Sequence, residues 1–182
     1  AAGDGVRMKS AKPKVLAEVL FKPMIDWVVD CAADSGLDDG DICVVTGYGR
    51  ELLCEHLRDG IKTVVQQERL GTGHAVMQAL KFIEEHGSSN VLVLNGDAPM
   101  IDSETIKLAL EYHIRSGNAA TVISANVKEP TGYGRIKRDA NGLFTKIVEE
   151  KDASEDEKKI AEVNSGAYWF SCQALLIALD IW

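Results

Sequence analysis

The chain opens with Ala1-Ala2-Gly3-Asp4-Gly5-Val6-Arg7-Met8, and Pro13-Lys14 follows shortly after. The two glycines lack a Cβ and let backbone N–H groups approach an anion closely, while Arg7 and Lys14 bring positive charge to the same loop. This combination predicts a loop that holds phosphate groups. It is neither a Walker loop nor a dinucleotide fingerprint, because Gly-Lys-Ser/Thr is missing and Met8 stands where a third glycine belongs. The alternative is a plain surface turn.

The composition indicates one acidic globular unit. The 182 residues are 46% hydrophobic, with a formal net charge of -8, which suits one buried core and argues against nucleic acid or an anionic membrane as the main partner. No apolar stretch reaches about 18 residues and no leader pattern precedes the loop, so we expect no membrane span, no secretion signal and a cytoplasmic location. The 4 cysteines contain no Cys-x-x-Cys pair, which is typical of free thiols.

Strand and helix patterns alternate along the first two thirds of the chain. Buried-strand patterns occur at 42–46, 61–65 and 91–94, and helical spacing occurs at 24–33, 51–58, 73–85 and 103–115. This alternation predicts an α/β fold in which helices cover both faces of a sheet, in three layers.

The later part of the chain has the pattern of antiparallel strands, at 121–127, 135–138, 143–148 and 163–170. Asn141-Gly142 is a strong hairpin signal, so we expect a β-hairpin insertion in a mixed, mostly parallel sheet. Residues 151–162 form a charged, helix-compatible segment that we expect to be a solvated connector. Residues 173–182 begin a helix. Both ends are expected to be cut, because a buried strand usually feeds a phosphate loop and the last helix is incomplete.

The segment from Gln66 to Ala75, which contains Gly71-Thr72-Gly73-His74, lies between a predicted strand and a predicted helix. Open α/β sheets bind ligands at that edge. Gln66 offers a paired donor and acceptor, and the glycine-rich turn frees backbone groups to meet the edge of a base such as uracil. The alternative is a simple helix start capped by Thr72. We expect His74 to orient the turn, because no nucleophile stands beside it.

Asp97 follows the most hydrophobic predicted strand, in Asn95-Gly96-Asp97. A lone carboxylate at the carboxyl edge of a sheet suits Mg²⁺, which keeps several waters and takes other ligands from substrate phosphates. The alternative is that Asp97 caps the next turn. Asp102 fits that capping role better, because Glu104 would lie in the first turn of the following helix.

Three further positions predict a sugar pocket. Thr131-Gly132-Tyr133-Gly134-Arg135 leads into the hairpin, Glu149 ends a later strand, and Asn164 begins the last one. Carboxylate and amide side chains hydrogen-bond hydroxyl groups, and a glycine backbone can approach an acetamido group closely. Individually, each position also fits an ordinary turn or strand end.

Taken in order, these motifs resemble the bacterial N-acetylglucosamine-1-phosphate uridyltransferases over nearly the whole chain. The resemblance implies a Rossmann-like nucleotidyltransferase fold and a single pyrophosphorylase domain over residues 1–182. It also implies that the C-terminal left-handed β-helix acetyltransferase domain, through which homo-oligomers are expected, is not included. The implied reaction transfers UMP from UTP to N-acetylglucosamine 1-phosphate with Mg²⁺, for peptidoglycan and cell-wall synthesis.

The resemblance also implies roles for individual residues. The nucleotide would be held by Ala1, Ala2, Gly3, Gly5, Gln66, Gly71 and Thr72. Arg7 and Lys14 would hold the phosphates as catalytic cations, and Asp97 would hold Mg²⁺. The sugar would be held by Gly134, Glu149 and Asn164.

The chain departs from the family pattern at a few positions. Asp4 adds a negative charge beside the expected triphosphate, Asn95 replaces an aromatic residue, and Ser165 replaces threonine. The family also supplies an Asn metal ligand beyond Trp182, so the fragment is expected to lack part of its metal site. Two alternatives stay open: a related transferase using another sugar or nucleotide, and a catalytically silent nucleotide-sugar-binding homologue.

Overall fold

The computed structural model describes residues 1–3, 12–68 and 70–180, so Gly5 and Arg7 lie outside the described residues, as does Asp4. The helices are α1 (Met24–Asp34), α2 (Arg50–His56), α3 (Thr72–Met77), α4 (Leu80–His86), α5 (Ser103–Ser116) and α6 (Cys172–Asp180). Short 3-10 helices are η2 (Lys14–Leu16), η3 (Asp39–Asp41), η4 (Glu150–Asp152) and η5 (Glu157–Lys159). Within these ranges, no helix is both long enough and apolar enough to cross a membrane.

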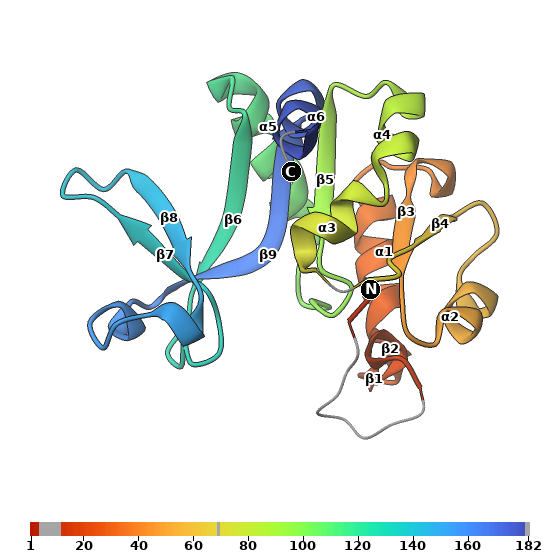
Figure 1. Ribbon diagram of the computed structural model, residues 1–182, viewed down its shortest axis with the longest axis horizontal. Helices are drawn as coiled ribbons and strands as arrows, with labels where there is room; N and C mark the ends of the chain where they lie inside the picture. The colour runs from red at the N-terminus through yellow and green to blue at the C-terminus, as the bar shows by residue number, and fades with distance from the viewer. Residues whose placement is uncertain (4–11, 69, 181–182) are drawn as a thin grey trace.

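The strands are β1 (Glu18–Val19), β2 (Lys22–Pro23), β3 (Cys43–Thr46), β4 (Lys62–Val65), β5 (Asn90–Leu94), β6 (Ala120–Asn126), β7 (Arg135–Arg138), β8 (Phe144–Val148) and β9 (Glu162–Ser171). β3 and β4 pair in parallel. β9 pairs antiparallel with both β5 and β6, so these two strands run in the same direction. The hairpin of β7 and β8 extends to one side of the molecule (Figure 1) and joins the sheet through β9. The predicted mixed α/β sheet with a hairpin insertion is confirmed.

Alternate residues of the central strands face two different helical layers, as the period of two along a strand requires. Val44 packs with residues of α1 and α2. Its neighbour Val45 packs on the opposite side, with residues of α4 and α6. In β5, Leu92 packs with Ile106 of α5, whereas Val91 joins the cluster of α4 and α6. The three predicted layers are therefore present.

The predicted single helix over residues 73–85 is wrong, because α3 and α4 are separate. The backbone N–H groups of Gln78 and Ala79 bond three residues back, to Ala75 (3.2 Å) and Val76 (2.9 Å). The side chain of Gln78 donates to the carbonyl of His74 at 3.2 Å. This carbonyl is the acceptor that the backbone N–H of Gln78 would use in a continuous α-helix, so the helix ends here.

The charged segment 151–162, which we expected to be a solvated connector, does not form an α-helix, because η4 and η5 occupy it before β9 begins. The backbone N–H and hydroxyl of Ser154 both bond the carboxylate of Glu157 at 3.0 Å, which closes a tight local turn. Lys137 of β7 bonds the same carboxylate at 2.7 Å. The segment is thus fastened to the hairpin.

Candidate active site

The start of the predicted phosphate loop lies against the carboxyl ends of β3 and β5. A Cβ on Gly47, which follows β3, would lie only 2.7 Å from the carbonyl oxygen of Ala2. A Cβ on Gly96, after β5, would lie 3.2 Å from the Cβ of Ala1. Glycine at both positions therefore lets Ala1 and Ala2 sit between the two strand ends.

The far end of the loop uses a third glycine. Gly49 has φ +68°, and a Cβ there would lie 2.7 Å from Cγ of Pro13, directly before Lys14. Sequence reasoning does not single out Gly47 or Gly49, although a signal was available. The pentapeptide Thr-Gly-Tyr-Gly-Arg stands at 46–50 as well as at 131–135.

Lys14 and Asp97 form an ion pair across this edge. The Lys14 Nζ lies 2.6 Å from Oδ2 of Asp97, and the two side chains are 43% and 38% exposed. The predicted phosphate-binding cation and the predicted metal ligand are therefore neighbours. Because both groups stay in contact with water, their mutual attraction is weak and either can turn to a ligand.

The alternative role of Asp97 as a helix cap belongs to Asp102, as the sequence predicted. The backbone N–H of Thr105 donates to Oδ1 of Asp102 at 2.8 Å, at the start of α5. This bond and a second from the Thr105 hydroxyl lower the pKa of Asp102. Among the described residues, no three His, Cys, Asp or Glu side chains gather to hold a metal. Asp97 is thus free of a capping role and stands as a single carboxylate.

The predicted base-recognition turn is organised by Gln66, which is 6% exposed. Its Nε2 bonds the carbonyl of Gly71 and Nδ1 of His74, both at 3.0 Å. No described donor reaches its Oε1. The expectation that His74 orients the turn is confirmed. Thr72 begins α3 but does not cap it, because Gly71 is the N-cap, so that alternative is wrong.

The backbone of this turn is hydrogen-bonded to the end of β3, where Gly47 makes room for Ala2. The backbone N–H of Gln66 donates to the carbonyl of Thr46 at 2.8 Å, and Thr46 directly precedes Gly47. Gln66 is therefore held beside the strand end on which Ala2 rests.

The three predicted sugar-binding residues lie side by side, with Gly134 directly before β7, Glu149 directly after β8 and Asn164 within β9. Arg135 of β7 pairs with both β8 and β9, so the residue directly before it, Gly134, lies between the chain segments on both sides. A Cβ on Gly134 would lie 3.3 Å from Oε1 of Glu149 and 3.6 Å from Cβ of Asn164. The backbone N–H of Asn164 donates to the Gly134 carbonyl at 2.8 Å. We call Gly134, Glu149 and Asn164 the sugar row.

The sugar row connects to the strand end that carries Asp97. Oδ1 of Asn164 accepts from the Gly166 N–H at 3.0 Å, and the backbone N–H of Asn95 donates to the Gly166 carbonyl at 3.1 Å. The amide nitrogen of Asn164 donates to the Tyr168 hydroxyl at 2.6 Å. Burial and then the charge of Glu149 raise the pKa of Tyr168. Sequence reasoning does not single out Tyr168, although its even spacing from Asn164 along β9 was a usable signal.

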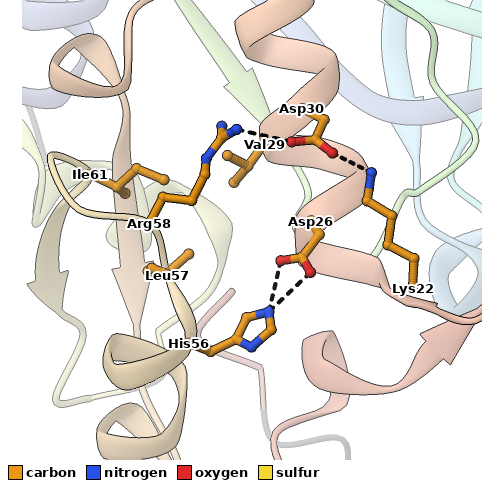
Figure 2. A pocket seen from close by; sticks show the side chains of 8 residues that line it. All are labelled: Lys22, Asp26, Val29, Asp30, His56, Leu57, Arg58 and Ile61. Carbon is orange, nitrogen blue, oxygen red and sulfur yellow. Dashed lines mark hydrogen bonds and ion pairs between the residues drawn. The ribbon is translucent and has the colours of Figure 1, made fainter.

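A cavity of about 210 Å³ lies elsewhere, between α1 and the segment from α2 to β4 (Figure 2). None of the predicted site residues lines it. Its lining residues are Lys22, Asp26, Val29, Asp30, His56, Leu57, Arg58 and Ile61.

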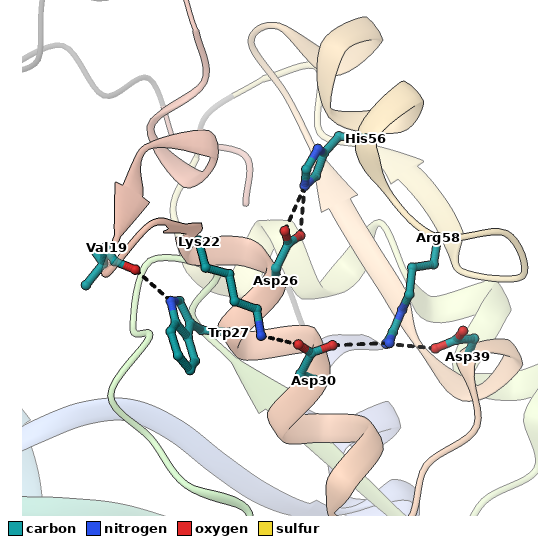
Figure 3. A network of polar contacts seen from close by, with 8 residues as sticks. All are labelled: Val19, Lys22, Asp26, Trp27, Asp30, Asp39, His56 and Arg58. Atoms are coloured by element: carbon teal, nitrogen blue, oxygen red, sulfur yellow. Dashed lines mark hydrogen bonds and ion pairs between the residues drawn. The ribbon is translucent and has the colours of Figure 1, made fainter.

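The charged groups of this cavity are matched with one another. Figure 3 shows the carboxylate of Asp30 between Lys22 and Arg58, and Arg58 also bonds Asp39 at 2.9 Å. His56 bonds Asp26 at 2.8 Å. This network fastens α1 to the segment after α2. Each charged side chain that lines the cavity already has a partner of opposite charge and is not available to bind a charged ligand.

A family model described as nucleotidyl transferase matches residues 1–181. The bifunctional protein GlmU of Caldanaerobacter subterraneus subsp. tengcongensis is 50% identical over 98% of this chain and 38% of its own length. The protein of the same name from Clostridioides difficile is 45% identical over 100% of this chain and 39% of its own. The chain thus spans about two fifths of the length of these relatives.

Solved structures share the fold at low sequence identity. A Bacillus anthracis protein described as a glucose-1-phosphate thymidylyltransferase, in complex with sucrose, has a TM-score of 0.82 at 21% identity, covering 100% of this chain and 73% of its own. A UDP-glucose pyrophosphorylase complexed with UDP-glucose has a TM-score of 0.76 at 19% identity, covering 99% and 77%. Together with the family model, which spans nearly every residue, these likenesses place the fold, and the chain belongs to the nucleotidyl transferase family.

Proposed function

We propose that this chain transfers UMP from UTP to N-acetylglucosamine 1-phosphate, giving UDP-N-acetylglucosamine and pyrophosphate for cell-wall precursor synthesis. One observation carries the proposal. The predicted base-recognition turn (residues 66–75, called the base turn below), the Lys14–Asp97 pair and the sugar row adjoin one another along the ends of β3 and β5 and the start of β9. Identities of 44–50% to relatives named bifunctional protein GlmU favour this substrate pair within the family.

Gln66 would read the base. Its amide nitrogen is committed to Gly71 and His74, so the side-chain oxygen is the group left for a ligand. An acceptor on a side chain that is itself largely buried suits the N3–H donor of uracil. Gly71 and Thr72, exposed beside it at the start of α3, would supply further backbone contacts.

Lys14 and Arg7 would neutralise the triphosphate of UTP. An oxygen of the sugar phosphate would attack the α-phosphorus in line, forming a new P–O bond while the bond to the pyrophosphate oxygen breaks. No covalent intermediate with the protein is needed. The chain contributes by positioning the two substrates, the sugar phosphate on the sugar row and the nucleotide on the loop and base turn.

Asp97 would hold Mg²⁺, which supplies charge neutralisation at the phosphates. The donor set fits this ion, because Mg²⁺ commonly takes one or two carboxylates and completes its coordination with water and substrate oxygens. Asp97 is a partly exposed carboxylate with no cap to make, and its ion pair with Lys14 brings a second phosphate-binding group beside it.

The test is pyrophosphate release by the protein at its full natural length, with Mg²⁺, UTP and N-acetylglucosamine 1-phosphate. Glucose 1-phosphate and the other nucleoside triphosphates form the comparison panel. Selective turnover of the named pair is expected. Preference for another pair would support a related transferase, and binding of nucleotide without release would support the silent homologue.

A further inference from the structure

Arg135 is a buried charge directly behind the sugar row. It is 1% exposed, and its guanidinium bonds Oε2 of Glu150 at 2.8 Å and the Lys158 carbonyl at 3.3 Å. A further N–H donates to the Tyr133 carbonyl. One guanidinium therefore holds the loop before β7 and both 3-10 turns of the segment before β9.

Glu150 completes the arrangement from the other side. The same Oε2 that pairs with Arg135 accepts from the backbone N–H of Gly132 at 2.9 Å. Both contacts lower the pKa of Glu150, the N–H bond first and the guanidinium second, which keeps the carboxylate ionised. Loop residues 132–135 are thus clamped against the residue that follows Glu149.

We call the Arg135–Glu150 pair the clamp. Burying its guanidinium costs free energy that a purely structural contact would not require. Nε of Arg135 is buried and has no hydrogen-bond partner among the described residues. An orphaned buried donor loses the hydration it had in water, and an apolar side chain of similar volume often fills such a space at equal or lower free energy. Stability alone therefore does not account for Arg135, and we look instead to the positions of the residues that it holds.

We propose that the Arg135–Glu150 pair is the positioning device of the sugar row. Arg135 follows Gly134 and Glu150 follows Glu149, so one ion pair sets the distance between two members of the row. The third member, Asn164, lies opposite Gly134 through the pairing of Arg135 with β9. The inference deepens the proposed function and rests on it: the Arg135–Glu150 pair controls binding of the sugar phosphate, whereas Gln66 and Lys14 lie on other elements and have other polar partners.

The decisive variant is Arg135→Met with Glu150→Gln in the full-length protein, because removing both charges leaves no unpaired buried ion. The matched control is Arg138→Met with Glu162→Gln. That pair, at 2.6 Å, joins β7 to β9, whereas the Arg135–Glu150 pair joins β7 to η4, and its arginine lies three residues beyond Arg135 along β7. Steady-state kinetics with each substrate varied, together with urea unfolding, are the measurements.

The clamp variant is expected to raise KM for the sugar phosphate about tenfold, with KM for UTP and kcat within about twofold. The control should leave both KM values unchanged at a comparable stability. An unchanged sugar KM in the folded clamp variant overturns the inference, as does an equal rise in both KM values.

If the double variant does not fold, Arg135→Lys decides, because one ammonium cannot reach all three acceptors. It should raise the sugar KM about threefold, and no change refutes the clamp. Absence of turnover in the unsubstituted protein would instead reject the proposed function itself, and the clamp with it.

Discussion

The ammonium group of Lys14 lies 2.6 Å from the carboxylate of Asp97, although the two residues are 83 positions apart in the chain. Both side chains are partly exposed. An exposed ion pair of this kind contributes about 0 to 1 kcal/mol to stability, because water competes for both charges. The pair lies at the strand ends, next to the glycines that make room for Ala1 and Ala2. Substitutions here should therefore lower activity while changing the free energy of unfolding little.

Asp97→Ala is expected to lower pyrophosphate release at least about a hundredfold while leaving the free energy of unfolding within about 1 kcal/mol. The reason is that the variant loses the proposed ligand of Mg²⁺ and little packing. Turnover at saturating Mg²⁺ and urea unfolding check the two halves. The matched control is Asp156→Ala, whose carboxylate is 92% exposed and should be silent in both assays. Full activity of Asp97→Ala would remove Asp97 from the metal site.

Gly134→Ala should raise KM for the sugar phosphate about tenfold or more, because the added methyl group has no room. Its carbon would lie 2.9 Å from Cγ2 of Ile147 and 3.3 Å from Oε1 of Glu149, which must then move. Gly40→Ala is the control, since a Cβ there meets nothing within 4 Å. Initial rates with the sugar phosphate varied give the answer. An unchanged KM would place the sugar elsewhere.

The sugar row shows how far the sequence reaches. The hairpin signal at Asn141-Gly142 predicts that β7 and β8 pair, which brings Gly134 opposite Glu149. The place of Asn164 depends on the pairing of β7 with β9, a long-range contact that no local pattern encodes. The helical layers were predictable from a different signal, the hydrophobic periodicity, which reports which face of an element is buried.

Features set by individual side chains were not predictable from periodicity. The break between α3 and α4 arises where the Gln78 side chain takes the carbonyl of His74. The turns before β9 depend on Glu157 bonding both Ser154 and Lys137. In both cases a local hydrogen bond competes with the helix, and the sequence alone does not show which partner wins.

Glu157 predicts a pH dependence. The Lys137 ammonium, followed by the backbone N–H and hydroxyl of Ser154, lowers the pKa of Glu157 to about 2, from an ordinary value of 4.5. Since the folded protein binds this proton less readily than the unfolded chain, the stabilisation is complete above about pH 4.5 and is lost as the pH falls toward about 2. Glu157→Gln should therefore be less stable than the unsubstituted protein at neutral pH, with a gap that narrows on acidification.

Urea unfolding at a series of pH values between about 7 and about 3 measures this gap. Glu155→Gln provides the control, because its carboxylate is 87% exposed and its ion-pair partner within the described ranges is Lys158, three residues on. Its effect should be small at every pH. A gap for Glu157→Gln that stays constant or widens on acidification would contradict the assigned contacts.

The turn between β1 and β2 carries the last prediction. Leu20 and Phe21 have φ values of 52° and 65°, a region that costs residues other than glycine about 1 to 2 kcal/mol, and their side chains are 74% and 96% exposed. Asn-Gly is the pair that suits such a two-residue turn. Leu20→Asn with Phe21→Gly should therefore raise the free energy of unfolding by about 1 kcal/mol, less than the strain removed, because glycine also gains freedom in the unfolded chain. Leu143→Asn, which removes a 64% exposed side chain without relieving a positive φ, should change little. A lower urea midpoint for the turn variant would mean that the two apolar side chains make stabilising contacts of their own.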